Sequence, residues 1–497
     1  MNKKLYWIAI FLFCLFLACL STNYDYDLFA RLIVGERFIE EGLLPFKDFL
    51  SYTPTHDWFD HEWGSGVIFY IILKHFGAFG IVMFQALCML FTTFFIIKFQ
   101  KLQRYTLSVS FTYIIVFLLC FYSLNSWLIR CQLFSFLFFS IFLYLLEKHR
   151  KTGSKIIWLI PLITILWNNI HGGVVAGLGL IFLYLAGSLL EKKSYSAYLL
   201  ILVISLLSLI INPYGIKYIS FLFSAVTMSR KYIVEWASPL HSYHIKKYIP
   251  VFVYVLFGSV IYIYNNLKTK NIDYTKILIL SATAIEGLMH VKMLSFGVIS
   301  VTAISYNEIS MLFKPLKKYT KIAEKSLFAA VFFISLSIPL FSPQVPRLSV
   351  NLYPIQEVEF LKLNNIKGNL LTSFEIGSYV SYKLYPDNLI YMDGRYEEVY
   401  NDKEFLALKS YELGQQDWQD IIKNYHTEIL MPRKNLKIYQ ILSNDPDWIE
   451  IYNGPLFGIF IEKNNPYINK TLILPEYDIN YYRHNMFKGN KWGNKIS

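Results

Sequence analysis

Long apolar runs separated by short basic loops are the feature that most limits how this chain can fold. After a basic start at residues 1–4, about eleven such runs follow one another through the first two thirds of the sequence. A full bilayer crossing needs roughly 20 apolar residues in a helix, and several of the runs are shorter than that. In order they are residues 5–20, 77–97, 106–124, 133–147, 156–168, 174–190, 199–212, 249–264, 277–291, 293–312 and 327–342. The pattern predicts an α-helical polytopic membrane domain.

The composition excludes a chain made only of soluble domains. Hydrophobic residues make up 55% of the 497 residues and charged residues 16%, whereas soluble domains carry about 25% charged residues. The net charge is +12, but the positive residues lie in the short loops, so membrane topology explains them better than nucleic-acid binding. The five cysteines form no CxxC pair, which signals neither a zinc site nor a disulfide framework.

The distribution of positive charge sets the expected orientation, because cytoplasmic loops are enriched in Lys and Arg. Every second loop is basic, which places the N-terminus in the cytoplasm and the C-terminal domain outside. The longer 213–248 segment is an exception. A cleaved signal peptide at residues 5–20 is the rival interpretation, and we favour a retained helix. The predicted cytoplasmic loops carry Lys98, Lys101, Arg104, Lys148, Arg150, Lys151, Lys155, Lys192, Lys193, Lys268, Lys270, Lys276, Lys314, Lys317, Lys318, Lys321 and Lys325.

The composition changes at Pro343, where Asn, Asp, Glu and Pro become more frequent. Helical and strand patterns then alternate, which is typical of a small α/β domain. We therefore expect a membrane domain over residues 1–342, with a first external loop at 21–62, and an extracytoplasmic α/β domain over 343–497. The expected helices are 354–363, 376–384, 418–423 and 434–442; the expected strands are 369–373, 389–392, 427–431, 448–452 and 456–462.

The first external loop holds the best candidates for chemistry. Asp25 and Asp27 follow the first apolar run by a few residues, and a carboxylate at the membrane surface can act as a general base toward a hydroxyl. The alternative for Asp27 is a helix N-cap before Leu28. His61 and Glu62 precede an apolar helix, and adjacent residues do not share a helix face, so their spacing does not indicate a metal pair. No metal or other cofactor is indicated by the sequence.

Ionisable residues also occur at the predicted outer ends of the spans, where such groups are candidates for function. Arg130 lies in a short outer turn, and His171 in a polar turn between two spans. Glu286 and His290 are four residues apart, on one face of a predicted helix, with Lys292 just beyond. The cations could line one outer cavity suited to a phosphate; the alternative is a paired structural cluster.

Several of these positions form a recognisable pattern. It runs Asp-x-Asp-x-aromatic, Pro-x-x-Asp-x-x-Ser-Tyr-Thr and Trp-x-x-His-Glu-Trp, and it continues through residues 130–135, 169–172, 212–215, 235–236, 368–369, 377–379 and 392–397. The chain in this respect resembles bacterial multi-span proteins grouped with the GT-C glycosyltransferases, the lipid-linked-sugar transferases that include the protein O-mannosyltransferase and aminoarabinose-transferase types.

The resemblance implies a specific reaction. A sugar would pass from a polyprenyl-phosphate carrier to a glycan, lipid or protein acceptor on the non-cytoplasmic face of the bacterial inner membrane, with inversion at the anomeric carbon. Asp25, or Asp27 close behind it, would be the base, and Asp48 a second acidic position for acceptor or metal. Lys292 stands where the resemblance implies an Arg, which would bind phosphate bidentately. Asp393 and Arg395 are expected to form a buried structural pair.

Two other functions remain open at this point. The chain could be a non-catalytic envelope protein whose tail binds glycan or protein. It could also be a polysaccharide or lipid transporter, although the few charges inside the apolar runs argue mildly against a polar transport path.

Overall fold

The fold was analysed in a computed structural model, which describes residues 3–20, 25–103, 110–126, 128–228, 230, 233–241, 245–313, 315, 317–341 and 352–475. By its internal contacts the chain forms two units. The helical unit comprises Met1–Ser21 and Val82–Val345, and the mixed unit comprises Thr22–Ile81 and Pro346–Ser497. The sequence-based division assigns residues 21–62 to the membrane domain, whereas the structure groups residues 25–62 with the tail. Residues 21–24 and the expected boundary at 342/343 lie outside the described residues.

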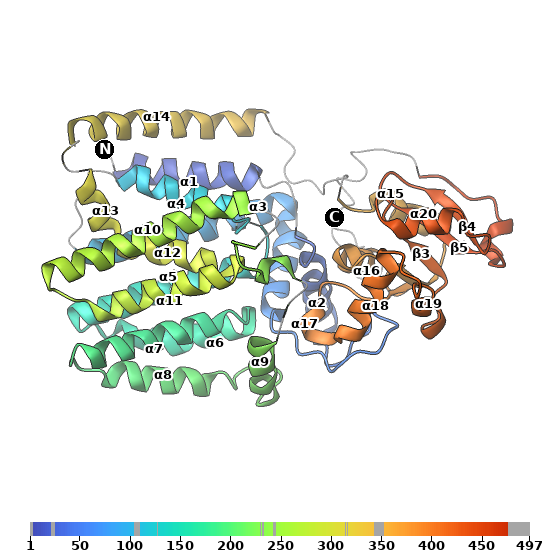
Figure 1. The fold of residues 1–497 in the computed structure, drawn as a ribbon, viewed down its shortest axis with the longest axis horizontal. Coiled ribbons are helices and arrows are strands. Elements are labelled where there is room, and N and C mark those ends of the chain that lie inside the picture. Colours follow the sequence, from blue (N-terminus) through green and yellow to red (C-terminus); the bar gives the residue numbers. More distant parts are fainter. Residues whose placement is uncertain are drawn as a thin grey trace. The chain divides into compact units, whose positions relative to one another are not determined.

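Within the described residues, most of each predicted apolar run falls on a helix; residues 106–109 and 342 lie outside them. Figure 1 shows the long helices of the helical unit lying side by side. The expected run at 293–312 proved to be two helices, because the chain bends at Ser305. The helices are α1 (Lys3–Leu20), α3 (Trp63–Leu102, shared with the mixed unit), α4 (Ser110–Ser123), α5 (Gln132–Thr152), α6 (Ile160–Ile170), α7 (Val174–Leu190), α8 (Ser196–Ser208), α9 (Lys217–Thr227), α10 (Ile245–Thr269), α11 (Tyr274–Met289), α12 (Leu294–Ile304), α13 (Tyr306–Leu312) and α14 (Lys317–Phe341).

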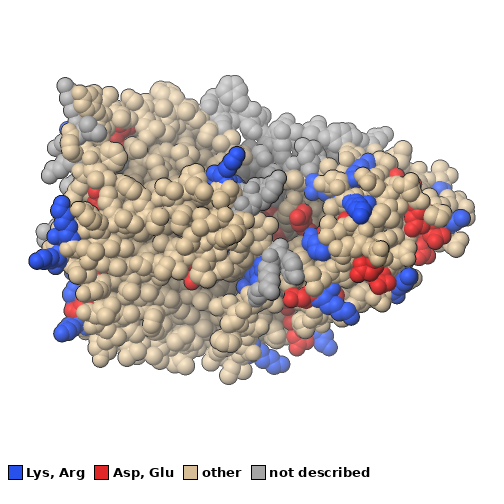
Figure 2. All heavy atoms as spheres, viewed as in Figure 1, with Lys and Arg blue, Asp and Glu red and all other residues tan. Residues whose placement is uncertain are grey.

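The helical unit has the surface of a membrane protein. Helices α1, α3 and α10 are long and apolar enough to cross a bilayer, and five shorter helices are also apolar. Large apolar side chains such as Phe182, Leu207 and Phe223 are more than half exposed on the outer helix faces. Figure 2 shows the sides of this unit almost free of charged residues, with Lys and Arg gathered at one end. Surfaces this apolar require a lipid environment, although the number of spans stays a prediction.

Small residues let the helices approach closely. A Cβ at Gly187 in α7 would lie 2.2 Å from the side chain of Thr275 in α11, and a Cβ at Gly258 in α10 would lie 2.2 Å from Val301 in α12. Contacts of this kind are common between helices in membranes, where packing rather than hydrophobic burial drives association.

Three of the loops predicted to be cytoplasmic meet at one end of the helical unit. Arg150, at the end of α5, contacts Glu191 at 3.3 Å and Asp273 at 2.8 Å. Lys276 at the start of α11 joins them through Asp273 and Glu147, at 3.5 and 3.4 Å. This network fixes the ends of α5, α7 and α11 together. The side of the membrane on which it lies stays a prediction.

The mixed unit is built on a five-stranded sheet with the order β2-β1-β3-β5-β4. Parallel pairing joins β1 to β2 and β3, and antiparallel pairing joins β5 to β3 and β4. The strands are β1 (Gly368–Thr372), β2 (Asn388–Ile390), β3 (Ile429–Met431), β4 (Trp448–Asn453) and β5 (Gly458–Glu462), all within two residues of the expected positions. The helices are α2 (Leu28–Glu41), α15 (Ile355–Leu363), α16 (Gly377–Leu384), α17 (Tyr396–Val399), α18 (Asp402–Glu412), α19 (Asp420–Asn424) and α20 (Lys437–Ser443).

The first external loop packs as part of this unit. Backbone bonds run from Tyr52 N–H to Ile390 O (3.1 Å) and from Ile390 N–H to Leu50 O (3.0 Å), so the loop pairs with the edge strand β2. Helix α2 crosses the first turn of α3 where glycines face each other, since a Cβ at Gly35 would lie 2.1 Å from the backbone oxygen of Gly66. The loop is therefore fixed by the tail domain's sheet. The residues between 64 and 73, for which the sequence left two interpretations, continue into α3, which breaks at Gly77 (φ 60°, ψ −162°).

Candidate functional site

Asp25 and Asp27 lie together at the start of α2. Asp25 is 3% exposed, and its Oδ1 accepts the backbone N–H of Asp27 at 3.0 Å. Asp27 occupies the N-cap position as expected, but its side chain makes no capping hydrogen bond. Its Oδ1 instead lies close to Gly394. A Cβ atom added to that glycine would be 2.4 Å from this oxygen. The two carboxylates also act on Tyr353, whose pKa is raised first by burial and then by the charges of Asp25 and Asp27.

Asp48 belongs to a buried ionic centre around Arg395, which we call the Arg395 centre. The guanidinium bonds to Asp48 at 2.7 Å and to Asp393 at 2.8 Å, and it stacks 4.3 Å from the ring centre of Trp58. The side chains of Asp48, Asp393 and Arg395 are at most 1% exposed. The predicted pair of Asp393 and Arg395 is present. Asp48, expected to contact acceptor or metal, instead completes this centre, because the loop packs against the tail.

A second buried centre surrounds Arg31 of α2, and we call it the Arg31 centre. Arg31 bonds to Asp60, to Glu398 at 2.9 Å and to Glu62 at 3.4 Å. Glu398 also accepts the indole N–H of Trp58 at 2.7 Å. Burial raises the pKa of Glu398 to about 7 despite the opposing charge of Arg31, and burial likewise raises the pKa of Asp60. Three carboxylates face one guanidinium, so the centre is short of positive charge.

His61 and Glu62 lie in a turn before α3, so the helix-face argument against a metal pair does not apply to them. The rings and carboxylates of His61, Glu62 and Glu398 bring ligand atoms within 4.8 Å of one another. His61 lies 3.5 Å from both Glu62 and Glu398. The set has ligand types that suit a divalent cation, but Arg31 already contacts both carboxylates. A proton on Glu398 is the simpler source of the missing charge.

In the helical unit, cations gather around Glu235 and Trp236; we call this the Glu235 cluster. Arg130 bonds to Glu235 at 2.5 Å. Burial alone would raise the pKa of Glu235, but Arg130 and Lys292 outweigh it, and the pKa lies below its ordinary value. Lys292 and Arg230 lie 5.3 and 4.3 Å from the ring centre of Trp236.

His290 joins the same cluster through its ring, whose Nδ1 bonds to the backbone oxygen of Trp236 at 2.7 Å. The expected common helix face of His290 and Glu286 is wrong. Helix α11 ends at Met289, and His290 is extended (φ −139°, ψ 123°), so its side chain leaves the helix while Glu286 stays exposed. Of the predicted outer residues, the structure brings Arg130, His290 and Lys292 together.

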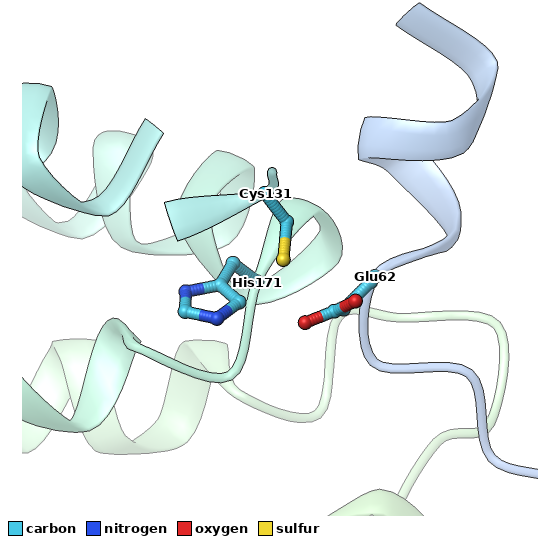
Figure 3. A group of neighbouring side chains, drawn as sticks. All are labelled: Glu62, Cys131 and His171. Carbon is cyan, nitrogen blue, oxygen red and sulfur yellow. The ribbon is translucent and has the colours of Figure 1, made fainter. Parts of the chain in front are cut away.

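His171 lies in the turn between α6 and α7. Its Nδ1 accepts the backbone N–H of Gly173 at 3.1 Å and bonds to Ser135 Oγ at 2.5 Å, and Trp167 donates to the same oxygen at 2.7 Å. Since Nδ1 accepts, the proton of the neutral ring is on Nε2. Figure 3 shows His171 beside Cys131, which precedes α5; Glu62, also labelled there, belongs to the mixed unit. Hydrogen bonding thus fixes the tautomer and orientation of this histidine.

The fold resembles those of solved glycosyltransferases. The apo oligosaccharyltransferase of Archaeoglobus fulgidus matches with TM-score 0.57 and 8% identity, over 87% of this chain and 70% of that one. AglB from the same organism, in complex with an inhibitory peptide and a dolichol-phosphate, matches with 0.58 and 7%, over the same shares of 87% and 70%. The chain has the fold of the GT-C glycosyltransferases.

A third match extends the comparison to bacteria. The arabinofuranosyltransferase AftD from Mycobacteria gives TM-score 0.52 at 10% identity, over 94% of this chain and 40% of AftD, so this chain spans less than half of AftD's length. No protein-family model and no curated protein matches the sequence.

Sequence reasoning missed Arg31 and Glu398, on which the Arg31 centre depends, and gave no role to Glu235 in the cationic cluster. Arg31 sits inside an ordinary amphipathic helix, and Glu398 is separated from it by more than 360 residues. Glu235 was noted only as part of a family pattern. A signal existed for Glu235, because it is the sole acidic residue in a loop that departs from the charge alternation of the other loops.

Proposed function

We propose that this chain is a membrane glycosyltransferase that moves a sugar from a polyprenyl-phosphate donor to an acceptor on the non-cytoplasmic face, with Asp25 as the general base. The GT-C fold supports transferase activity in general. One neighbour was solved with a dolichol-phosphate and a peptide, which is consistent with a lipid-phosphate donor here. We place the protein in the bacterial inner membrane, with its N-terminus in the cytoplasm.

The observation that carries the proposal is the pairing of Asp25 and Asp27 in a shielded position just beyond the first apolar helix. A carboxylate that is 3% exposed and held by the backbone N–H of Asp27 has a defined orientation. Such a base would accept the proton of an acceptor hydroxyl as its oxygen attacks the anomeric carbon, and the lipid phosphate would leave from the opposite face. This displacement inverts the anomeric configuration.

The Glu235 cluster supplies positive charge, which is the second requirement of the proposed reaction. Arg130, Lys292 and Lys247 lower the pKa of Glu235, and Arg230 lies 4.3 Å from the ring centre of the adjacent Trp236. Positive charge in excess suits the phosphate, on which negative charge develops as the glycosidic bond breaks. We propose that Arg130 and Lys292 bind the phosphate of a lipid-linked donor.

The test is replacement of the acidic pair. Asp25→Asn and Asp27→Asn keep the side-chain shape and remove the base, so glycan transfer should fall about 10²–10⁴-fold in the variant that loses the general base. The variants are expressed in a strain that lacks the native gene, and envelope glycans and glycoproteins are compared by mass spectrometry. Asp447→Asn, at an exposed position in the mixed unit, is the matched control. Wild-type glycan levels in both Asp25→Asn and Asp27→Asn, with normal membrane insertion, would refute the assignment.

A further inference from the structure

A small cavity lies between α18 and α19 in the mixed unit, outside the two ionic centres described above. Its volume is about 60 Å³, enough for a few water molecules or one edge of a small ring. Tyr391, which follows β2, and Tyr425, which precedes β3, contribute aromatic walls with ring centres 5.7 Å apart. The polar lining residues are Lys403, Glu404, Ser410, Asp417, Asp420 and Asn424.

Glu404 gives this cavity the character of a binding site. It is 4% exposed, and its Oε1 accepts the hydroxyl of Tyr425 at 3.2 Å. Its Oε2 is buried and accepts no hydrogen bond from the part of the chain that the structure describes. An acceptor left unsatisfied in this way is costly, so a ligand that donates a hydrogen bond to it would be favoured.

The chemistry of the lining residues limits the classes of ligand that the cavity can bind. Among the described residues, Glu404, Asp417 and Asp420 do not converge on one point as the ligands of a metal ion do. Three carboxylates against the single Lys403 repel anions. What remains is a neutral ligand with several hydroxyl donors and an apolar ring face that can lie against tyrosine.

We propose that this cavity admits one edge of a neutral sugar residue of a glycan, whose hydroxyls donate to Glu404 and form hydrogen bonds with Asn424 at the rim. The choice of a sugar among polyhydroxylated ligands rests on the proposed glycosyltransferase function. Lys403, Asp417, Asp420 and Asn424 are exposed, so the rest of a glycan chain can extend into solvent. The site would hold an acceptor glycan at a point separate from the reacting hydroxyl.

The test measures binding alone, by saturation-transfer NMR on the full-length protein in nanodiscs. The probes are methyl glycosides of glucose, galactose, mannose and arabinose, with glucuronic acid as the anionic comparison. At least one neutral probe should bind with a dissociation constant in the millimolar range, and Glu404→Gln should weaken it about tenfold or more, because a hydrogen bond to a charged acceptor is lost. Glu412→Gln, on the same helix but outside the cavity, should bind as wild type does.

Asn424→Ala changes an exposed side chain and tests the same site with little risk to folding; it should weaken binding severalfold. Asp25→Asn should leave binding unchanged, so a protein that binds sugar without transferring it separates this site from the proposed base. Three results would overturn the proposal: no neutral probe binding at about 50 mM, well above a millimolar dissociation constant; unchanged affinity in Glu404→Gln and Asn424→Ala; or glucuronic acid binding as tightly as the neutral probes.

Discussion

The two buried ionic centres of the mixed unit and the Glu235 cluster of the helical unit organise charge in opposite ways. In the mixed unit, Arg31 and Arg395 are each enclosed by more than one carboxylate, and their side chains are at most 4% exposed. In the helical unit, Glu235 is approached by several cations and its side chain remains 40% exposed. In the Arg31 and Arg395 centres, the positive charge is neutralised by buried carboxylates. In the Glu235 cluster, positive charge stays available at the surface.

This difference suggests that the buried centres have a structural role and that the Glu235 cluster has a binding role. Buried ion pairs contribute little net stability but are costly to break, so they fix one arrangement of the groups they join. The Arg395 and Arg31 centres join the first external loop to the tail domain, and the loop carries Asp25 and Asp27. Among the described residues, the Glu235 cluster is partly exposed and holds more cations than carboxylates, which fits a role in holding an anionic ligand.

The largest effect is expected from a substitution of Arg395, which tests whether the buried centre holds the mixed unit together. Arg395→Met removes the only cation that the structure places between Asp48 and Asp393, and leaves two buried carboxylates facing each other. Breaking a buried ion pair in this way costs about 3–5 kcal/mol, so the mixed unit should unfold or become protease-sensitive at 37 °C. Limited proteolysis and thermal unfolding in nanodiscs measure this.

Arg37→Met is the control for that experiment. Arg37 pairs with Glu41 one turn away on α2, and both side chains are about a quarter exposed. Arg37 also lies 4.2 Å from the ring centre of Phe49, and a partly exposed pair with one cation–π contact contributes about 1 kcal/mol. If Arg395→Met proved no worse than Arg37→Met, the Arg395 centre would not be what holds the loop to the tail.

The fold could be predicted from sequence to the extent that it depends on local patterns. Apolar runs identified the helices of the helical unit except α9, and the alternation of helical and strand patterns after Pro343 identified the strands of the mixed unit. Helix α18 was missed, although Asn401 at its N-cap, Asp402 and Glu404 in its first turn and the buried Phe405 and Leu408 are helix signals. The contribution of the first external loop to the sheet could not be predicted, because it depends on pairing between residues more than 300 positions apart.

The candidate site shows the same limit. The sequence identified the pair of Asp393 and Arg395 because the residues are two positions apart. It could not give Asp48 its partner, 347 residues away, and therefore assigned it to acceptor or metal. His290 was placed on a helix face because α11 carries no stop signal before it, and only tertiary contact with Trp236 explains its position.

At the Glu235 cluster, loss of one cation should impair donor use and leave folding intact. Arg130→Ala should raise KM for the lipid-linked donor about 10–100-fold, the effect of losing roughly 1.4–2.7 kcal/mol of charge-assisted hydrogen bonding. Lys292→Arg should retain activity, because it keeps the charge and adds bidentate geometry. Steady-state kinetics with a synthetic donor measure both variants. Unfolding of Arg130→Ala comparable to that of Arg395→Met would mean that the two units do not differ in this way.

The two units should also respond to pH with opposite signs. Burial raises the pKa of Glu398 from 4.5 to about 7, so the folded mixed unit binds the proton more tightly than the unfolded chain. Its stabilising effect is complete below pH 4.5 and is lost as pH rises toward 7, a fall of about 2 kcal/mol or less. The pKa of Glu235 is lowered, so its contribution is present above the ordinary glutamate pKa and is lost as pH falls below it.

Thermal unfolding followed at pH 5 to 8 should therefore show the mixed unit losing stability, and Glu398→Gln should flatten that dependence. Glu235→Gln should leave it unchanged over the same range, because Glu235 is ionised throughout. A mixed unit whose stability rises from pH 5 to 8 would contradict the charge deficit inferred for the Arg31 centre.

The smallest effect is expected at Ser135, where the helical unit has a buried polar group without net charge. The Ser135 hydroxyl donates to His171 Nδ1 and accepts the indole N–H of Trp167. Ser135→Ala leaves that N–H buried without its acceptor, at a cost of about 1 kcal/mol in stability. The matched control is Ser140→Ala, on the same helix, whose hydroxyl bonds only to the backbone oxygen of Leu137 among the contacts described.

The Ser135→Ala variant should keep its affinity for the donor. Because His171 keeps the Gly173 N–H as a donor to Nδ1, its tautomer should persist. Donor KM should therefore stay within about twofold of wild type, less than 0.5 kcal/mol. A Ser135→Ala variant that lost donor affinity as Arg130→Ala does would place His171 within the anion-binding surface, and the helical unit would then have two functional polar centres rather than one.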